Sequence, residues 1–177
     1  MGRPLPPQGR ERRPGRARVR GVKLHNLLSE ELIAPDLKSR TRDEVLKEIV
    51  DFLRSKGKVS RGKSLYEKLL QREELGSTAI GDGVAIPHCK LKGLKGPLLA
   101  LGISRPGVDF GAPDERPSHL FFLVVCSPDD PSTSLQILAA IAHLVRKAAE
   151  LPRRVMGAGS SKAVIEIIRG EEDRLHA

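Results

Sequence analysis

The sequence predicts an α/β fold: a single domain in which helices pack on the faces of a mixed β-sheet. Segments whose apolar residues recur at helical spacing alternate with short, continuous apolar runs of strand length, the pattern of helices layered on a sheet. The two longest runs, 98–104 and 120–126, are typical of strands buried on both faces. A chain of 177 residues with 39% apolar content can fill one core, and we find no internal repeat.

The N-terminal half is expected to begin with a short helical turn and a first strand within residues 24–36. Residues 41–44, Thr-Arg-Asp-Glu, form a capping box, so a helix should begin at Thr41 and end at Gly57. A second helix is expected over 62–73. Apolar residues recur at helical spacing in both segments, and we interpret these stripes as core rather than as grooves for a partner.

The C-terminal half contains the two apolar runs and three further helices. The expected elements are, in chain order, a basic loop at 90–96, a strand at 98–104, turns at 106–117, a central strand at 120–126, and helices at 131–147, 151–156 and 161–169. Asp130 and Pro131 suit the cap and the first position of the longest of these helices. One face of that helix is expected to carry Leu135, Leu138, Ala142 and Val145.

The net charge of +9 is concentrated at the N-terminus. Residues 1–23 contain eight basic residues and one acidic residue, so the domain expected over 24–177 is nearly neutral. The basic stretch is rich in Pro, Gly and Arg, and we expect a disordered tail. A nucleic-acid or anionic-surface arm is the less favoured alternative. The sequence from Val22 onward looks like the natural start of the domain. Valine can reflect an alternative start codon in a bacterial gene, and translation from Val22 would leave residues 1–21 untranslated.

The composition indicates a protein of the cytoplasm. No stretch approaches the roughly 20 apolar residues of a membrane helix, and the basic N-terminus lacks the apolar region of a secretory signal. The two cysteines, Cys89 and Cys126, do not make a disulfide framework and suit a reducing compartment. Together with His88 they lack the paired spacing of metal ligands, so we expect no metal site and no cofactor.

The candidate chemistry lies in residues 73–90, Glu-Glu-Leu-Gly-Ser-Thr-Ala-Ile-Gly-Asp-Gly-Val-Ala-Ile-Pro-His-Cys-Lys. A glycine-interrupted turn leads into the short apolar run 84–86. Pro87 lacks an N–H and is expected to end that strand, which places His88 at a strand end or edge. Neutral imidazole is a good nucleophile at physiological pH. A histidine after a proline is also common in ordinary loops.

This segment resembles the enzyme IIA component of the bacterial phosphoenolpyruvate phosphotransferase system, in its fructose/mannitol and nitrogen-regulatory class. The resemblance covers roughly residues 24–170 and implies the corresponding fold. It also implies that His88 accepts a phosphoryl group from a small histidine phosphocarrier protein, through Nε2, with Nδ1 held by a backbone carbonyl. Cys89 departs from the commoner glycine but is still a small residue.

Phosphoryl transfer requires positive charge near the outer phosphate oxygens, and Arg72 is the best candidate cation. The resemblance places a functional arginine here, and a guanidinium forms paired hydrogen bonds to phosphate. The alternative role of Arg72 is to cap its own helix. Lys90 and Lys92 are weaker candidates. Many sugar-transport members have a second histidine where this chain has Ser134, whose hydroxyl donates hydrogen bonds but carries no charge.

The leading hypothesis is a phosphocarrier and regulatory protein, a phosphotransferase if it is active. Neither a membrane span nor a cysteine-bearing acceptor domain is fused to it, which favours the stand-alone, nitrogen-regulatory type. The expected partners are a histidine phosphocarrier protein upstream and a regulatory protein or an enzyme IIB component downstream, without a membrane. The alternative is a binding module of the same fold with little or no phosphotransfer. A hydrolase using Cys89 is disfavoured, because adjacent residues on extended backbone point to opposite faces.

Overall fold

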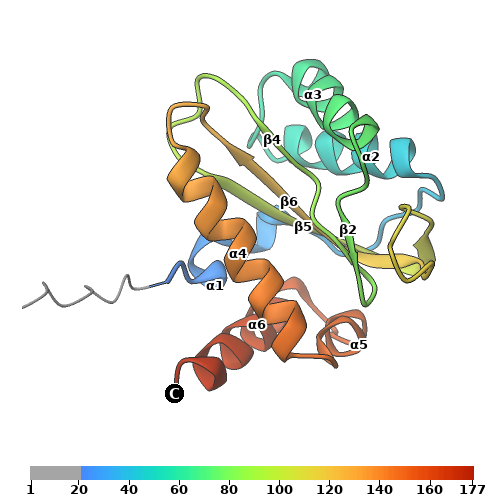
Figure 1. Cartoon of the computed structure of the whole chain (residues 1–177), viewed down its shortest axis with the longest axis vertical. Coiled ribbons are helices and arrows are strands. Elements are labelled where there is room, and N and C mark those ends of the chain that lie inside the picture. The colour runs from blue at the N-terminus through green and yellow to red at the C-terminus, as the bar shows by residue number, and fades with distance from the viewer. Residues whose placement is uncertain (1–20) are drawn as a thin grey trace, which may run out of the picture.

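The structure, a computed structural model, describes residues 21–177 and confirms the α/β fold (Figure 1). A six-stranded mixed sheet carries helices on both faces. Residues 1–20, most of the predicted tail, lie outside the described residues. The elements are, in chain order, α1 (Leu24–Leu27), the 3-10 helix η1 (Glu30–Leu32), β1 (Ile33–Ala34), α2 (Arg42–Ser55), α3 (Gly62–Glu74), β2 (Ala79–Gly81), β3 (Val84–Ala85), β4 (His88–Lys90), β5 (Leu98–Val108), β6 (Ser118–Cys126), α4 (Pro131–Lys147), α5 (Leu151–Met156) and α6 (Ser161–Leu175).

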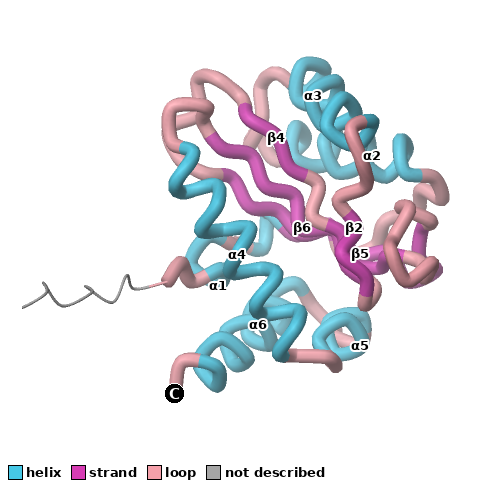
Figure 2. Tube along the Cα trace, in the orientation of Figure 1, coloured by secondary structure: helices cyan, strands magenta, loops and turns pink. Residues whose placement is uncertain are grey.

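The sheet is organised around β6, which confirms the central strand predicted at 120–126. The strand order is β1-β5-β6-β3-β2. Strand β5 pairs with β6 in the antiparallel sense, whereas β3 and β4 both pair with β6 in parallel, one after the other along its length. Figure 2 shows the strands in magenta between two groups of helices.

Each face of the sheet is covered by its own apolar core. One core includes residues of α1, α4, α5 and α6, and the other includes residues of α2 and α3. Successive residues of β6 alternate between the two: Phe122 and Val124 belong to the first, and Phe121 and Leu123 to the second. Burying each such side chain contributes about 1.5–3 kcal/mol, so β6 stabilises both layers.

The predicted helix starts are confirmed by their caps. The Thr41 hydroxyl accepts a hydrogen bond from the Glu44 N–H at 3.3 Å, and the Asp130 carboxylate accepts one from the Thr133 N–H at 3.2 Å. The last helix runs to Leu175, beyond the predicted end at 169, because one glycine in an exposed turn does not stop a helix that packs on its other side. Within residues 21–177, no helix combines the length and apolar character needed to cross a bilayer.

The extended part of α6 fastens the two ends of the described domain together. Glu172 is only 4% exposed. Its carboxylate accepts hydrogen bonds from the backbone N–H groups of Leu24 and His25 at 2.8 and 2.9 Å, and it lies 2.8 Å from His25 Nδ1. These contacts hold α1 against α6.

Three expectations from the sequence are wrong in detail. Strand β2 lies where no strand was expected, and β4, which begins at His88, includes Lys90, which was assigned to a loop, because strands this short are defined by their partners and not by their own pattern. Strand β5 continues to Val108 through an irregularity in its pairing with β6. Leu135 of α4 is 67% exposed, and the fully buried face is formed instead by Ile137, Ile141 and Leu144.

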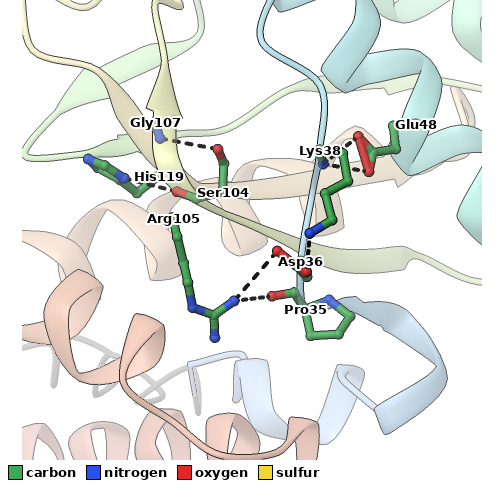
Figure 3. A network of polar contacts seen from close by, with 8 residues as sticks. All are labelled: Pro35, Asp36, Lys38, Glu48, Ser104, Arg105, Gly107 and His119. Carbon is green, nitrogen blue, oxygen red and sulfur yellow. Dashed lines mark hydrogen bonds and ion pairs between the residues drawn. The ribbon is translucent and has the colours of Figure 1, made fainter.

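A polar network fixes the connection from β1 to α2 against β5 (Figure 3). Arg105 donates to the Pro35 carbonyl at 3.1 Å, and Lys38 pairs with Asp36 at 2.6 Å. The backbone N–H of Lys38 donates to the Glu48 carboxylate on α2 at 2.9 Å. His88 is in register with Val124, which pairs with the start of β5, whereas Arg105 lies toward the other end of β5. The network therefore supports the sheet and not the candidate site.

Candidate functional site

His88 is the first residue of β4. The strand before Pro87 ends at Ala85, but the chain rejoins β6 immediately at His88, so Pro87 separates two strands where the sequence predicted the end of one. The Pro87 carbonyl accepts a hydrogen bond from the Val124 N–H at 2.9 Å, and His88 is in register with Val124. Pairing with β6 thus holds the backbone at Pro87, just before His88, and through the whole of β4.

The ring of His88 is oriented by one short hydrogen bond. Its Nδ1 lies 2.7 Å from the carbonyl oxygen of Ile86. A carbonyl only accepts, so Nδ1 must carry the proton, and in a neutral ring Nε2 then holds the lone pair. This bond confirms the backbone carbonyl partner that the resemblance implied. It leaves Nε2 as the ring nitrogen with the lone pair in a half-buried imidazole.

The three predicted site residues line one cleft of about 450 Å³. Its walls come from α3, β4 and the first turn of α4. The lining residues are Lys68, Gln71, Arg72, Leu75, His88, Cys89, Lys90 and Ser134. Three of them are cations and none is a carboxylate, so the cleft favours an anion beside the histidine.

Arg72 occupies the last turn of α3 and is already partly engaged. Its Nη1 donates at 2.9 Å to the carbonyl of Gly76, two residues beyond the end of that helix. A guanidinium has five N–H donors in a planar fork, so this bond leaves most of its hydrogen-bonding capacity free. Ser134 lines the same cleft from α4. Among the described residues, its hydroxyl forms no hydrogen bond with His88.

A buried carboxylate that the sequence reasoning did not single out supports this geometry. Glu73 is 3% exposed, and its side chain accepts hydrogen bonds from the Thr78 hydroxyl and from the Thr78 N–H, the latter at 3.1 Å. The Thr78 carbonyl in turn accepts the Ile86 N–H at 3.0 Å, and the Ile86 carbonyl accepts from His88. A continuous chain of hydrogen bonds therefore runs from the end of α3 to the imidazole.

The signal for Glu73 was present in the sequence. Leu65, Leu69 and Glu73 follow one another at four-residue spacing, which places a carboxylate on the buried face of α3. A buried carboxylate requires hydrogen-bond donors. The turn Gly-Ser-Thr that follows α3 supplies them through Thr78.

Comparison with known proteins identifies the family. The family model described as "Phosphoenolpyruvate-dependent sugar phosphotransferase system, EIIA 2" matches residues 26–170. The chain belongs to this EIIA 2 family. It is similar to the "Nitrogen Regulatory Protein IIA-Ntr" from Neisseria meningitidis, with 28% identity, a TM-score of 0.74, and coverage of 82% of this chain and 98% of that one.

This EIIA 2 chain is also similar to part of a longer protein and to one chain of a complex. It is 33% identical to the "PTS system fructose-specific EIIABC component" of Bacillus subtilis over 83% of its own length, but spans only 23% of that protein. The complex of enzyme IIAMTL and phosphorylated enzyme IIBMTL from Escherichia coli contains the same fold, with 19% identity, a TM-score of 0.65, and coverage of 81% of this chain and 97% of that one. In that complex a IIA protein pairs with a IIB component.

Cys89 of this EIIA 2 chain is poorly suited to nucleophilic catalysis. Burial raises the pKa of its thiol to about 12, although Lys68 opposes the rise. A thiol with so high a pKa is almost entirely protonated at neutral pH. Cys89 also packs toward the core shared with α2 and α3, which agrees with the expectation that it does not pair with His88.

An exposed leucine that the sequence reasoning missed lines the cleft, and another follows Ser134 in the chain. Leu75 lines the cleft and is 84% exposed, and Leu135, next to Ser134 on α4, is 67% exposed. Single exposed leucines are common, but one that lines a charged cleft suits contact with another protein. Within residues 21–177, no cluster of His, Cys, Asp and Glu side chains could hold a metal ion.

Proposed function

We propose that this chain is a phosphocarrier that accepts a phosphoryl group on Nε2 of His88 from a histidine phosphocarrier protein. The observation that carries the proposal is the 2.7 Å hydrogen bond from Nδ1 to the Ile86 carbonyl, which leaves Nε2 as the nucleophile. The surrounding cations and the absence of a lining carboxylate support the same chemistry.

In the proposed reaction, the Nε2 lone pair attacks the phosphorus of the donor phosphohistidine. The new N–P bond forms as the donor N–P bond breaks, and the donor imidazole leaves with the electron pair. Positive charge develops on the His88 ring during attack, and the Ile86 carbonyl stabilises it through the Nδ1 proton. Arg72, Lys68 and Lys90 are placed to neutralise the three outer oxygens.

The donor and the acceptor of the group are proposed to be proteins. The cleft is open, and the exposed side chain of Leu75 that lines it offers an apolar contact that a small phosphate ester does not need. We propose a histidine phosphocarrier protein upstream, and a regulatory partner or an enzyme IIB component downstream.

The alternative function is a regulatory binding module with little phosphotransfer. Two observations favour it: Ser134 contributes no charge to the cleft, and Arg72 already donates to the Gly76 carbonyl. A site of this kind would still bind a partner through the same rim.

The test is labelling by phosphoenolpyruvate in the presence of the general phosphotransferase proteins. We expect one phosphoryl group, located on His88 by tandem mass spectrometry at neutral to basic pH. His88→Ala should abolish the label, whereas His143→Ala, which changes an exposed histidine of α4, should leave it intact. An unlabelled wild type that still binds a partner favours the alternative, and label that persists in His88→Ala refutes the assignment.

A further inference from the structure

A second cleft, of about 430 Å³, opens at one end of the molecule. It lies between the connection from α2 to α3, residues 58–61, and the loop after β4, residues 91–98. These two segments lie near the upper ends of α3 and β4 in Figure 1. The cleft shares no lining residue with the His88 cleft.

The lining of this second cleft is strongly positive. Of the described residues, Lys58, Arg61, Lys92 and Lys95 line it, and no carboxylate does. Lys58 pairs with Glu31 at 2.8 Å. In the part of the chain that the structure describes, Arg61, Lys92 and Lys95 form no ion pair. A concave surface with uncompensated charge of one sign concentrates the field and attracts counter-ions.

The shape of the second cleft favours a small ligand over a large one. Its volume falls in the range of about 300–1,000 Å³ typical of small-molecule sites. Val59 and Leu91 are each only 7% exposed and provide an apolar floor between the cations. Gly93, with a φ of 86°, turns the loop so that Lys92 and Lys95 both line the cleft.

We propose that this second cleft binds a small ligand with two or more phosphate groups. The three cations without an ion pair in the described chain, Arg61, Lys92 and Lys95, would contact the phosphate oxygens through charge-assisted hydrogen bonds. An inorganic polyphosphate and a nucleoside polyphosphate share this chemistry, and they differ in whether an organic group covers the apolar floor. The proposal does not depend on phosphotransfer at His88, because the two clefts have separate linings.

Isothermal titration calorimetry of the full chain with sodium tripolyphosphate and with ATP tests the proposal. Lys92→Gln/Lys95→Gln should weaken binding of both probes by about tenfold or more, since each lysine supplies a charge-assisted contact. Lys68→Gln/Lys90→Gln removes two charges from the His88 cleft, and Lys147→Gln/Lys162→Gln removes two exposed charges elsewhere. Both control variants should bind within about twofold of wild type.

The possible outcomes separate the ligand classes. If ATP binds clearly more tightly than tripolyphosphate, the source is a nucleotide. If the two bind equally, it is an inorganic polyphosphate. The proposal is overturned if wild type binds neither probe, or if either control loses as much affinity as Lys92→Gln/Lys95→Gln. It is also overturned if a poly-glutamate peptide binds in place of both probes. His88→Ala should bind both probes normally, whatever its effect on phosphotransfer.

Discussion

Replacing Thr78 by valine should disconnect the buried carboxylate of Glu73 from its hydroxyl donor. Valine has nearly the same shape but cannot donate, so Glu73 would keep only the hydrogen bond from the backbone N–H of residue 78. The Glu73 carboxylate is only 3% exposed, so water cannot replace the lost hydrogen bond. The loss should lower the free energy of unfolding by about 2–3 kcal/mol. For a chain of this length, that corresponds to a fall in Tm of roughly 4–12 °C.

The same change should slow phosphorylation of His88. The Thr78 carbonyl holds the Ile86 N–H, and the Ile86 carbonyl orients the imidazole, so a shift at residue 78 reaches the nucleophile through two hydrogen bonds. We expect the initial labelling rate, measured well below the melting temperature, to fall on the order of tenfold. Urea denaturation and single-turnover labelling of the same preparations give the two quantities.

Thr133→Val is the matched control. The Thr133 hydroxyl also donates to a carboxylate, that of Asp130, but both residues are near the surface, where the loss should cost less than about 1 kcal/mol. Adding Glu73→Gln to Thr78→Val removes the buried charge and should recover part of the lost stability. If Thr78→Val unfolds within about 0.5 kcal/mol of wild type, Glu73 does not depend on this hydroxyl and the reasoning is refuted.

Three further predictions concern the cleft itself. Arg72→Lys should slow labelling of His88 severalfold with little change in Tm, because lysine cannot copy the guanidinium fork; an equal rate would reduce Arg72 to its contact with the Gly76 carbonyl. Ser134→His should speed single-turnover labelling severalfold, since a charge-assisted hydrogen bond exceeds a neutral one by about 1 kcal/mol; an equal or slower rate in a folded variant contradicts this. Cys89 should resist iodoacetamide at pH 8 in the native protein and react only after unfolding, because burial raises its thiol pKa to about 12; rapid native alkylation, located by peptide mapping, would contradict that.

Much of the fold was readable from the sequence because its strongest signals are local. The capped starts of α2 and α4 depend on side chains within a few residues of one another, and β6 is apolar from Leu120 to Cys126. The short apolar run before Pro87 predicted β3, but β2 and β4 contain three residues each and exist through pairing with β3 or β6, which no local pattern reveals. Helix α4 carries apolar residues on most of its circumference, so spacing alone did not fix which face is buried.

Some features of the candidate site could likewise be predicted from the sequence, and others could not. His88, Arg72 and Ser134 were expected together from the resemblance, and they line one cleft, although their roles remain proposals. The partner of Nδ1 was also expected and is present. The hydrogen bonds that lead from Glu73 to Ile86 were not predicted, because they join a helix, a turn and a strand whose relative positions are set by packing.

The contacts of Glu172 with Leu24 and His25 suit this domain to insertion into a longer polypeptide. They bring the first and last helices of the described domain together, and Figure 1 shows α6 and the C-terminus far from β4 and α3, whose residues line the His88 cleft. A polypeptide can therefore enter and leave at neighbouring points without crossing the cleft. Such a domain can occur as a separate chain or as a segment of a longer one, as in the Bacillus subtilis component, and neither arrangement requires a change in the residues of its cleft.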